Sequence, residues 1–262
     1  RAWAGLGYEG LLALREGTTE TIGYVAVRRW DEPLFFRLVT NGHSMSSTSP
    51  AASRYMRLFS YLPLALRPRA ESALVVSFGL GSTAEALTES PWLRSIDVAD
   101  ISSDILELGR LAYAAPRRYP LDDPRVRARV EDGRFHLLTT RRRCDVITAE
   151  SPPPKNAGVV NLYSQEYFAL VRGALNEGGV ASHWLPVHNL SFDDARAITR
   201  AFCTVFEDCT LWTGAGYDWL LVGTRGLRPP GGDGFREPWS VPARQSAWAG
   251  VGPSLNTIRG PP

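Results

Sequence analysis

The feature that most constrains the fold is an alternating pattern. From residue 73 onward, short apolar runs alternate with segments in which apolar residues have helical spacing. Six runs are predicted as strands, at 74–78, 95–99, 125–130, 145–149, 180–185 and 210–212. Helices are expected near 82–88, 103–113, 165–175 and 192–202. Apolar strands that alternate with helices are typical of a mainly parallel sheet with helices on both faces. A last run, 219–223, follows closely enough to predict a hairpin with 210–212.

The N-terminal part follows a different pattern, because apolar and polar residues alternate over 12–42. Turn signals at Asp31-Glu32-Pro33 and Asn41-Gly42 predict a small antiparallel β unit. Residues 44–50 are predicted as a polar loop, and 51–62 as a helix that Pro63 ends. We expect three units: a β unit with its connecting helix (1–70), an α/β domain (71–225) and a Pro/Gly-rich tail (226–262).

Composition excludes several classes of function. The net charge of +2 implies no general affinity for polyanions, so we expect no nucleic-acid partner. Lys155 is the only lysine among the 29 basic residues. Neither the four histidines nor the three cysteines have the spacing of a metal site, so we expect no metal. An odd cysteine count favours a reducing compartment, with Cys144 as a small core residue.

The first residues and the hydropathy of the chain indicate where in the cell we expect the protein. We find no signal peptide and no apolar run of about 18 residues, so we expect a cytoplasmic protein. The chain starts at Arg1 without a methionine, which is compatible with a fragment of a longer protein.

A glycine-rich turn, Gly79-Leu80-Gly81, follows the first strand of the α/β rhythm and opens a helix. Glycine lets a ligand approach the backbone, and a helix N-terminus offers free N–H groups. Asp100 lies 21 positions after Gly79, at the end of the next strand, where a carboxylate can accept hydrogen bonds from both ribose hydroxyls. The pattern favours a nucleoside without pyrophosphate. The alternative is an ordinary α/β turn.

Two further acidic residues follow strands of the same predicted sheet. Asp132-Gly133 comes after the third strand, where a carboxylate could accept the amino group of adenine; the alternative is a simple Asx turn. Glu150 ends the fourth strand, at the edge where open α/β sheets bind ligands. There it could bind an amine or take its proton; the alternative is an exposed loop glutamate. The rigid Pro152-Pro153-Pro154 run follows, with Tyr163 within reach of the same edge.

Together these segments resemble the spermidine synthase (polyamine aminopropyltransferase) family. The likeness is carried by 74–82, 97–110, 123–134, 145–150 and 162–180, and spans about 12–225. It is greatest to large bacterial spermidine-synthase-like proteins that are often fused to transporter-like membrane helices. The resemblance implies a Rossmann-like fold of the S-adenosylmethionine-dependent methyltransferase type. It also allows a homodimer and a membrane domain in the parent protein, which would tether it.

The resemblance assigns roles to individual residues. It places Gly79, Gly81, Asp100, Asp132 and Gly133 around decarboxylated S-adenosylmethionine or its product methylthioadenosine. Glu150 and Tyr163 are the catalytic candidates, and Tyr55 is the residue expected to contact the substrate.

The departures lie on the amine side of the site. Acidic residues of the family fall here on Ala51, Ala52, Arg57 and Pro153. Because two ammonium groups need paired charges when they lose water, we expect poor transfer to putrescine.

We therefore predict a transferase that moves an aminopropyl or related group to an unidentified amine acceptor. One alternative is a methyltransferase that uses intact S-adenosylmethionine. Another is a non-catalytic nucleoside-binding domain that regulates a membrane protein.

Overall fold

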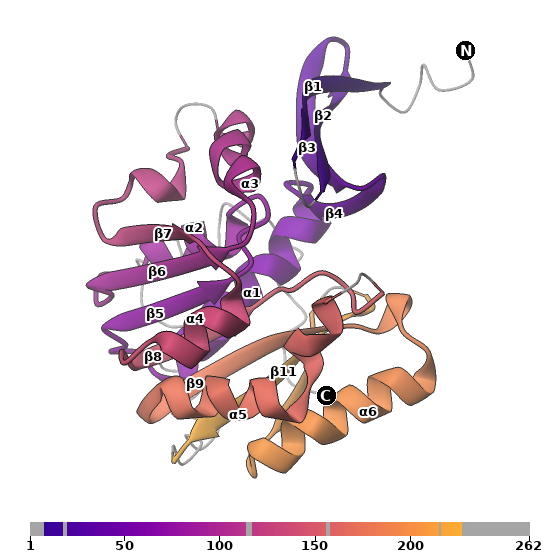
Figure 1. Ribbon diagram of the computed structural model, residues 1–262. Coiled ribbons are helices and arrows are strands. Elements are labelled where there is room, and N and C mark those ends of the chain that lie inside the picture. The colour runs from indigo at the N-terminus through magenta and orange to yellow at the C-terminus, as the bar shows by residue number, and fades with distance from the viewer. Residues whose placement is uncertain (1–7, 18–19, 114–116, 156–157, 215, 227–262) are drawn as a thin grey trace, which may run out of the picture.

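The computed structural model describes residues 8–17, 20–113, 117–155, 158–214 and 216–226. Two sheets make up its framework, a smaller N-terminal sheet and a larger one that carries helices on both faces (Figure 1). The tail predicted after Arg225 lies outside the described residues from 227 onward. Within the described part of the chain, no helix has the length and apolar character needed to cross a membrane.

The N-terminal sheet is an antiparallel meander of four strands in the order β1-β2-β3-β4. The strands are β1 (Tyr8–Glu16), β2 (Thr21–Arg29), β3 (Glu32–Thr40) and β4 (His43–Ser47). Asn41 and Gly42 both have positive φ, at 50° and 79°, as a tight hairpin turn requires. The prediction of a loop over 44–50 is wrong in its first half, because this turn brings 43–47 back onto β3 as a fourth strand.

The helix α1 (Pro50–Leu66) runs past Pro63, which we had expected to end it. A proline inside a helix leaves the carbonyl four residues earlier without its N–H partner. Here that carbonyl belongs to Phe59, and it accepts a hydrogen bond from the Ser182 hydroxyl at 2.9 Å. A side chain from the neighbouring sheet therefore replaces the lost bond, and the helix continues for one more turn.

The larger sheet has seven strands in the order β10-β11-β9-β8-β5-β6-β7. They are β5 (Ser72–Val76), β6 (Ser95–Asp100), β7 (Val126–Val130), β8 (Cys144–Ala149), β9 (Leu175–Pro186), β10 (Thr210–Thr213) and β11 (Asp218–Arg225). Strands β5 to β9 pair in parallel, while β10 and β11 form the predicted hairpin and join β9 antiparallel. The predicted mainly parallel sheet is confirmed.

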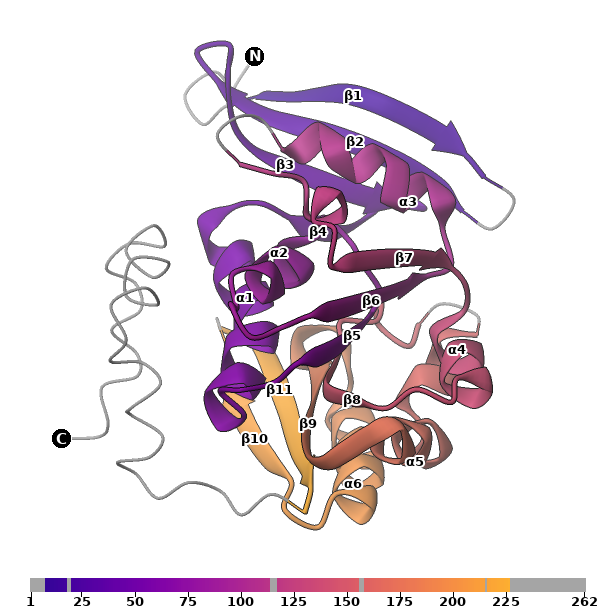
Figure 2. The same ribbon diagram turned by 90° about the vertical axis from the view of Figure 1, so that its left-hand side faces the viewer.

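Helices cover both faces of this sheet (Figure 2). The helices α1, α2 (Ser82–Thr88) and α3 (Ser103–Leu108) bury apolar side chains on one face, and α3 also packs against β2. On the other face lie α4 (Gly133–Thr139), α5 (Gln165–Ala174) and α6 (Phe192–Val205). Short 3-10 helices complete the chain: η1 (Gly109–Ala112), η2 (Pro120–Asp122), η3 (Val159–Tyr163) and η4 (Val187–Asn189).

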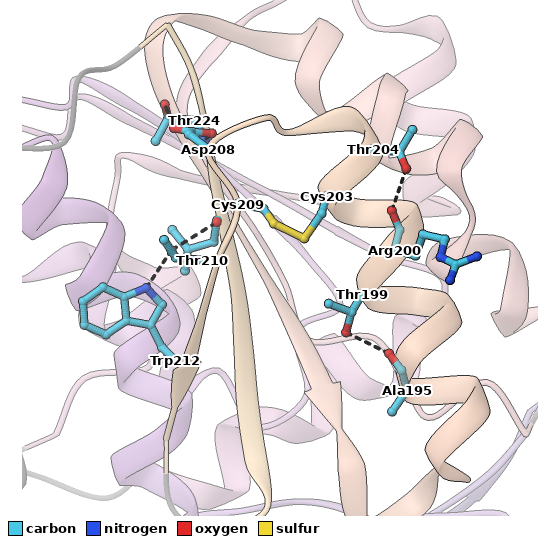
Figure 3. The surroundings of a disulfide bond; sticks show 11 residues. Ala195, Thr199, Arg200, Cys203, Thr204, Asp208, Cys209, Thr210, Trp212 and Thr224 are labelled. Atoms are coloured by element: carbon cyan, nitrogen blue, oxygen red, sulfur yellow. Dashed lines mark hydrogen bonds between the residues drawn. A yellow bond between two sulfur atoms is a disulfide. The ribbon is translucent and has the colours of Figure 1, made fainter.

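The cysteines differ from expectation. Cys203 in α6 and Cys209 before β10 form a disulfide that ties the helix end to the edge hairpin (Figure 3). Since disulfides rarely persist in reducing compartments, this bond argues against the reducing compartment that the odd cysteine count suggested. Cys144 is buried in the core as predicted, and burial raises the pKa of its thiol to about 12.

Candidate active site

The parallel strands β5, β6 and β8 end at a common edge, and a cavity of about 770 Å³ opens there. Its described wall includes residues from the N-terminal sheet, the glycine loop, the ends of β6 and β8, and η3. Five of the eight predicted site residues line it: Gly79, Asp100, Asp132, Gly133 and Glu150. Residues as far apart in the sequence as Glu20 and Trp184 thus meet where open α/β sheets bind ligands.

The glycine loop takes a conformation that only glycine adopts without strain. Gly79 and Gly81 have φ of 56° and 83°, in the left-handed region. A Cβ on Gly81 would lie 2.7 Å from the Phe78 ring, so this position also lacks room for a side chain. Gly79 lines the cavity, whereas Gly81 lies behind it, at the start of α2. The first glycine is therefore placed for a ligand and the second for the turn itself.

Asp100 ties this loop to the end of β6. Its carboxylate accepts the Phe78 N–H at 2.7 Å and the Ser102 N–H at 2.9 Å. Burial raises the pKa of Asp100 to about 6, although both hydrogen bonds favour the charged form. Glu20, from the segment between β1 and β2, raises this pKa further and lines the cavity itself. Each Asp100 oxygen keeps a second lone pair, so the carboxylate can still accept a ligand hydroxyl.

Asp132 and Gly133 sit where β7 gives way to α4. The Asp132 side chain caps the helix by accepting the Phe135 N–H at 2.7 Å, and it also lines the cavity. The local turn that the sequence offered as one alternative is thus present, and the same side chain also faces the cavity, as the other alternative requires. A Cβ on Gly133 would lie 2.4 Å from Val76, so the close packing of helix on strand explains this glycine.

Glu150 stands at the end of β8, partly buried, with neutral hydrogen-bonding partners. The Thr83 hydroxyl lies 3.2 Å from its Oε2 atom, and the Tyr55 hydroxyl is also hydrogen-bonded to it. Burial raises the pKa of Glu150 to about 8, because desolvation outweighs these two bonds, and the charge of Asp218 raises it further. A carboxyl group that titrates near neutral pH suits acid–base work.

Three predicted residues are not among the described residues that line the cavity. Gly81 supports the loop from behind, as described above. The Tyr55 hydroxyl is hydrogen-bonded to Glu150, so Tyr55 affects the cavity only through the Glu150 side chain. The Tyr163 hydroxyl faces the carbonyl oxygens of Ser151 and Pro152, at 2.9 and 3.1 Å. In this position Tyr163 holds the proline-rich loop, and its predicted catalytic role has no direct contact to support it.

Arg57, which falls on the amine side of the site in the family pattern, is not among the described residues that line the cavity. Its guanidinium is bound by Glu85 at 3.1 Å, by Glu89 and by the Tyr61 hydroxyl, in a network between α1 and α2. Ala51, Ala52 and Pro153 are likewise not among the described residues of the cavity wall. The four positions at which the family's acidic residues are replaced therefore place no cation on the described cavity wall, whose basic residue is Lys155.

Several wall residues were not predicted. Glu20 has a buried Oε1 atom for which the described residues offer no hydrogen-bond partner. Trp184 reaches the cavity from β9, and Lys155 from the loop after β8. The one available signal was that Lys155 is the only lysine of the chain. Trp184 and Glu20 gave none, since their positions depend on long-range packing. Within the described residues, no cluster of three or more His, Cys, Asp or Glu side chains could hold a metal.

The sheet order, the glycine loop after β5 and the carboxylate at the end of β6 define a Rossmann-like domain of the methyltransferase class. The solved human methyltransferase-like protein 13, in complex with SAH, shares this fold, with a TM-score of 0.56 and 17% identity over 76% of this chain and 91% of that one. The family model that describes the spermine/spermidine synthase domain matches residues 52–213 of the sequence. The chain therefore belongs to that family. The predicted family and fold class are thus confirmed.

Relatives within the family are similar over part of their length. The polyamine aminopropyltransferase of Bacillus subtilis (strain 168) is 29% identical over 126 residues, which cover 48% of this chain and 45% of that protein. The chain spans about half the length of the curated relatives it matches. The spermidine synthase of Thermotoga maritima has the same fold, with a TM-score of 0.72 and 18% identity over 84% of this chain and 74% of that one.

Proposed function

We propose that the chain binds a sulfonium nucleoside and transfers an aminopropyl or related group from it to an amine acceptor. One observation carries the proposal: the charge of the cavity. Its described wall holds four acidic side chains, those of Glu20, Asp100, Asp132 and Glu150, against the ammonium of Lys155, and a bound cation favours the ionised form of each acidic group. A cavity lined by one sign of charge concentrates ligands of the other sign. Decarboxylated S-adenosylmethionine and a protonated amine are both cations.

The nucleoside end of the site is formed by the residues around the glycine loop. Asp100 would accept the ribose hydroxyls while it keeps the loop in place through the Phe78 N–H. Asp132 would accept the adenine amino group, since its cap bond occupies only part of the carboxylate. Gly79 lets the nucleoside lie against the backbone. These roles follow from the family pattern, and the shared cavity supports them.

To promote the transfer, the protein has to position the two reactants and to supply one group that accepts a proton. The acceptor ammonium first loses one proton, and the lone pair that this frees on nitrogen forms a bond to the carbon next to sulfur. The carbon–sulfur bond breaks, and its electron pair stays on sulfur as a neutral thioether. The proton that the nitrogen must lose passes to Glu150, whose pKa of about 8 lets it accept and release protons near neutral pH. Tyr55 and Thr83 hold this carboxylate in place.

A second candidate is supported by Lys155. Intact S-adenosylmethionine carries a carboxylate that its decarboxylated form lacks, and the Lys155 ammonium on the cavity wall offers that group an ion pair. This contact would favour the intact co-substrate and a methyltransferase-like reaction. Replacement of Lys155 by Met separates the two candidates: it should weaken binding of intact S-adenosylmethionine only.

The predictions about domain organisation, oligomeric state and location remain predictions. They comprise the three units at 1–70, 71–225 and 226–262, a homodimer, a membrane domain in the parent protein and a cytoplasmic location. The Cys203–Cys209 disulfide argues against the last of these.

The test of the proposed function starts with calorimetry. Methylthioadenosine should bind the wild-type protein, and Asp100→Ala should weaken it by about 1.5–3 kcal/mol, as expected for hydrogen bonds to a charged group. Asp193→Ala, at an exposed residue of α6, is the control and should bind as the wild type does. Equal affinity for the Asp100 variant, with the fold intact, would remove Asp100 from the site.

Turnover is then measured with both sulfonium nucleosides over a panel of amines. Glu150→Gln should keep nucleoside binding and lose about 10²–10⁴-fold in rate. Turnover of no acceptor at all would support the regulatory alternative, whereas full activity of the variant would exclude Glu150 as the base. Putrescine kcat/KM should stay below about 10⁴ M⁻¹s⁻¹, the low end of ordinary enzymes.

A further inference from the structure

A second cavity lies on the face of the larger sheet that α4 and α5 cover (Figure 1). Its volume is about 230 Å³, and none of its described wall residues belongs to the wall of the candidate active site. We name it the Asp97 cavity, after the buried acidic residue in its wall. A space of this size admits several water molecules or one small organic molecule.

The Asp97 cavity exists because α4 is shorter than the strands beneath it. At 1.5 Å per residue, the seven residues of α4 extend about 10 Å. The six residues of β6, at 3.3 Å each, extend about 20 Å. The chain leaves the helix after Thr139 and enters β8 at Cys144. The space that remains has an apolar floor, which is formed by Leu74, Cys144 and Ala174.

The carboxylate of Asp97 lines this cavity, and the protein satisfies only part of it. The side chain is 8% exposed, and among the described residues its Oδ1 atom has no hydrogen-bond partner. The Oδ2 atom lies 3.5 Å from a guanidinium nitrogen of Arg142, which is long for a hydrogen bond. Because a buried charge without full pairing is unfavourable, this arrangement favours a ligand that brings an N–H donor to Oδ1.

Two arginines in the wall supply the opposite charge. Arg129 lies two residues beyond Arg127, the strand partner of Asp97, so these three side chains leave the same face of the sheet. The Arg129 side chain is exposed, and the ion pairs found within the described residues do not include it. The Arg142 side chain, 59% exposed, has its long contact with Asp97. Both guanidinium groups can therefore bind a carboxylate of a ligand.

The other charged wall residues bind each other. Oε2 of Glu131 lies 2.7 Å from Nδ1 of His136. With this pair formed, the cavity presents to a ligand the Asp97 carboxylate and the guanidinium groups of Arg129 and Arg142. An anionic ligand would leave Asp97 without a donor, and a cationic ligand would meet two arginines. A ligand with one charge of each sign matches both.

We propose that the Asp97 cavity binds a zwitterionic α-amino acid with a small apolar side chain. The ammonium group of the amino acid donates to Oδ1 of Asp97, and its carboxylate binds Arg129 and Arg142. Its side chain packs on the apolar floor. The inference goes beyond the transferase function proposed above and does not depend on it, because the two cavities are separate.

The probe is L-valine, and calorimetry measures its binding to the whole chain. Two analogues each lack one charged group: 3-methylbutanoate lacks the ammonium group, and isobutylammonium lacks the carboxylate. L-Valine should bind at least about 10-fold more tightly than either, the size expected for a lost hydrogen bond to a charged group. Saturating methylthioadenosine should leave the affinity for L-valine within twofold, because the two cavities have no described wall residue in common.

A pair of variants on one strand tests the basic side of the site. Arg129→Met should weaken L-valine binding about 10-fold, because it removes one of the two groups that bind the carboxylate. Arg127→Met is the matched control. It removes an exposed arginine from the same face of β7, outside the described cavity wall, and should bind L-valine as the wild type does.

Two further variants test the carboxylate and the floor. Asp97→Asn keeps the size of the side chain but removes its charge, so it should abolish most of the preference for L-valine over 3-methylbutanoate. Ala174→Leu fills the cavity from its floor without a change of charge, and should abolish L-valine binding. The second variant keeps the test decisive if Asp97→Asn does not fold.

Four results would each overturn the inference. They are no binding at about 10 mM L-valine, equal affinity for L-valine and either analogue, equal losses in Arg127→Met and Arg129→Met, and displacement of L-valine by methylthioadenosine. The last of these would place L-valine in the active-site cavity. If Asp97 serves only to pair with Arg142, Asp97→Asn will lower the melting temperature, and the wild type will show no preference for the zwitterion.

Discussion

Glu150 should make the stability of the protein depend on pH in a direction that is unusual for a carboxylate. Its pKa is raised from 4.5 to about 8 in the folded protein, chiefly by burial. The folded state therefore holds a proton that the unfolded chain loses as the pH rises above the ordinary value. Because the unfolded state then binds fewer protons, the stabilisation falls as the pH rises through this interval, and it is lost above the folded-state pKa.

The perturbation that isolates this effect is Glu150→Gln. Glutamine has nearly the same shape, can still accept from Thr83 and Tyr55, and does not titrate. At 1.36 kcal/mol per pKa unit, the wild-type protein should lose about 2.5 kcal/mol of unfolding free energy relative to the variant between about pH 6 and about pH 9. Groups that titrate elsewhere in the chain cancel, because both proteins contain them.

Urea unfolding at the two pH values measures the difference directly. The matched control is Glu107→Gln, at an exposed glutamate of α3, which should track the wild type at both pH values. If the stability difference between wild type and Glu150→Gln is the same at both values, Glu150 is ionised in the folded protein at pH 6. The argument that burial dominates at this site, and with it the choice of Glu150 as a base near neutral pH, would then be wrong.

Two further predictions concern residues around the cavity. Arg57→Met should lower the unfolding free energy by about 1–3 kcal/mol, because it leaves Glu85 and Glu89 with fewer partners between α1 and α2. It should leave turnover of the amine panel within twofold; a larger change would return Arg57 to the acceptor site. Gly81→Ala should destabilise the protein in urea by about 2–4 kcal/mol, from left-handed backbone strain plus the contact with Phe78. Gly42→Ala has the same strain and open space around the Cβ position, so it should cost only about 1–2 kcal/mol, and an equal cost for both variants would contradict the steric argument.

The nucleoside side of the candidate site was predictable because its signals are local. Gly79 and Asp132 each follow a strand and Asp100 ends one, and parallel strands end at one edge of a sheet. Short-range patterns thus implied that these residues would meet, and all three line one cavity. The same rhythm of apolar runs predicted the mainly parallel sheet and its final hairpin.

Local patterns failed where a distant contact decided the outcome. Pro63 is a helix breaker in isolation, but the Ser182 hydroxyl, 119 positions later, bonds to the carbonyl that the proline leaves free. Arg57 falls at a position that is acidic in the family, yet its guanidinium is bound by Glu85 of α2 and by Glu89, the residue that follows this helix. No spacing rule linked Cys203 to Cys209; the turn from α6 into β10 brings them together.

The sequence by itself therefore determined the fold class, the family and which strand-end residues meet at the cavity, because periodicity and strand-end position are properties of short segments. Only the tertiary structure decided the acceptor side. Trp184 and Asp218 belong together through the β9–β11 register, and Tyr55 joins them from α1. Charge and burial at Glu150 likewise depend on neighbours from three separate segments. Contacts of this kind are set by packing between distant parts of the chain, which a one-dimensional pattern does not encode.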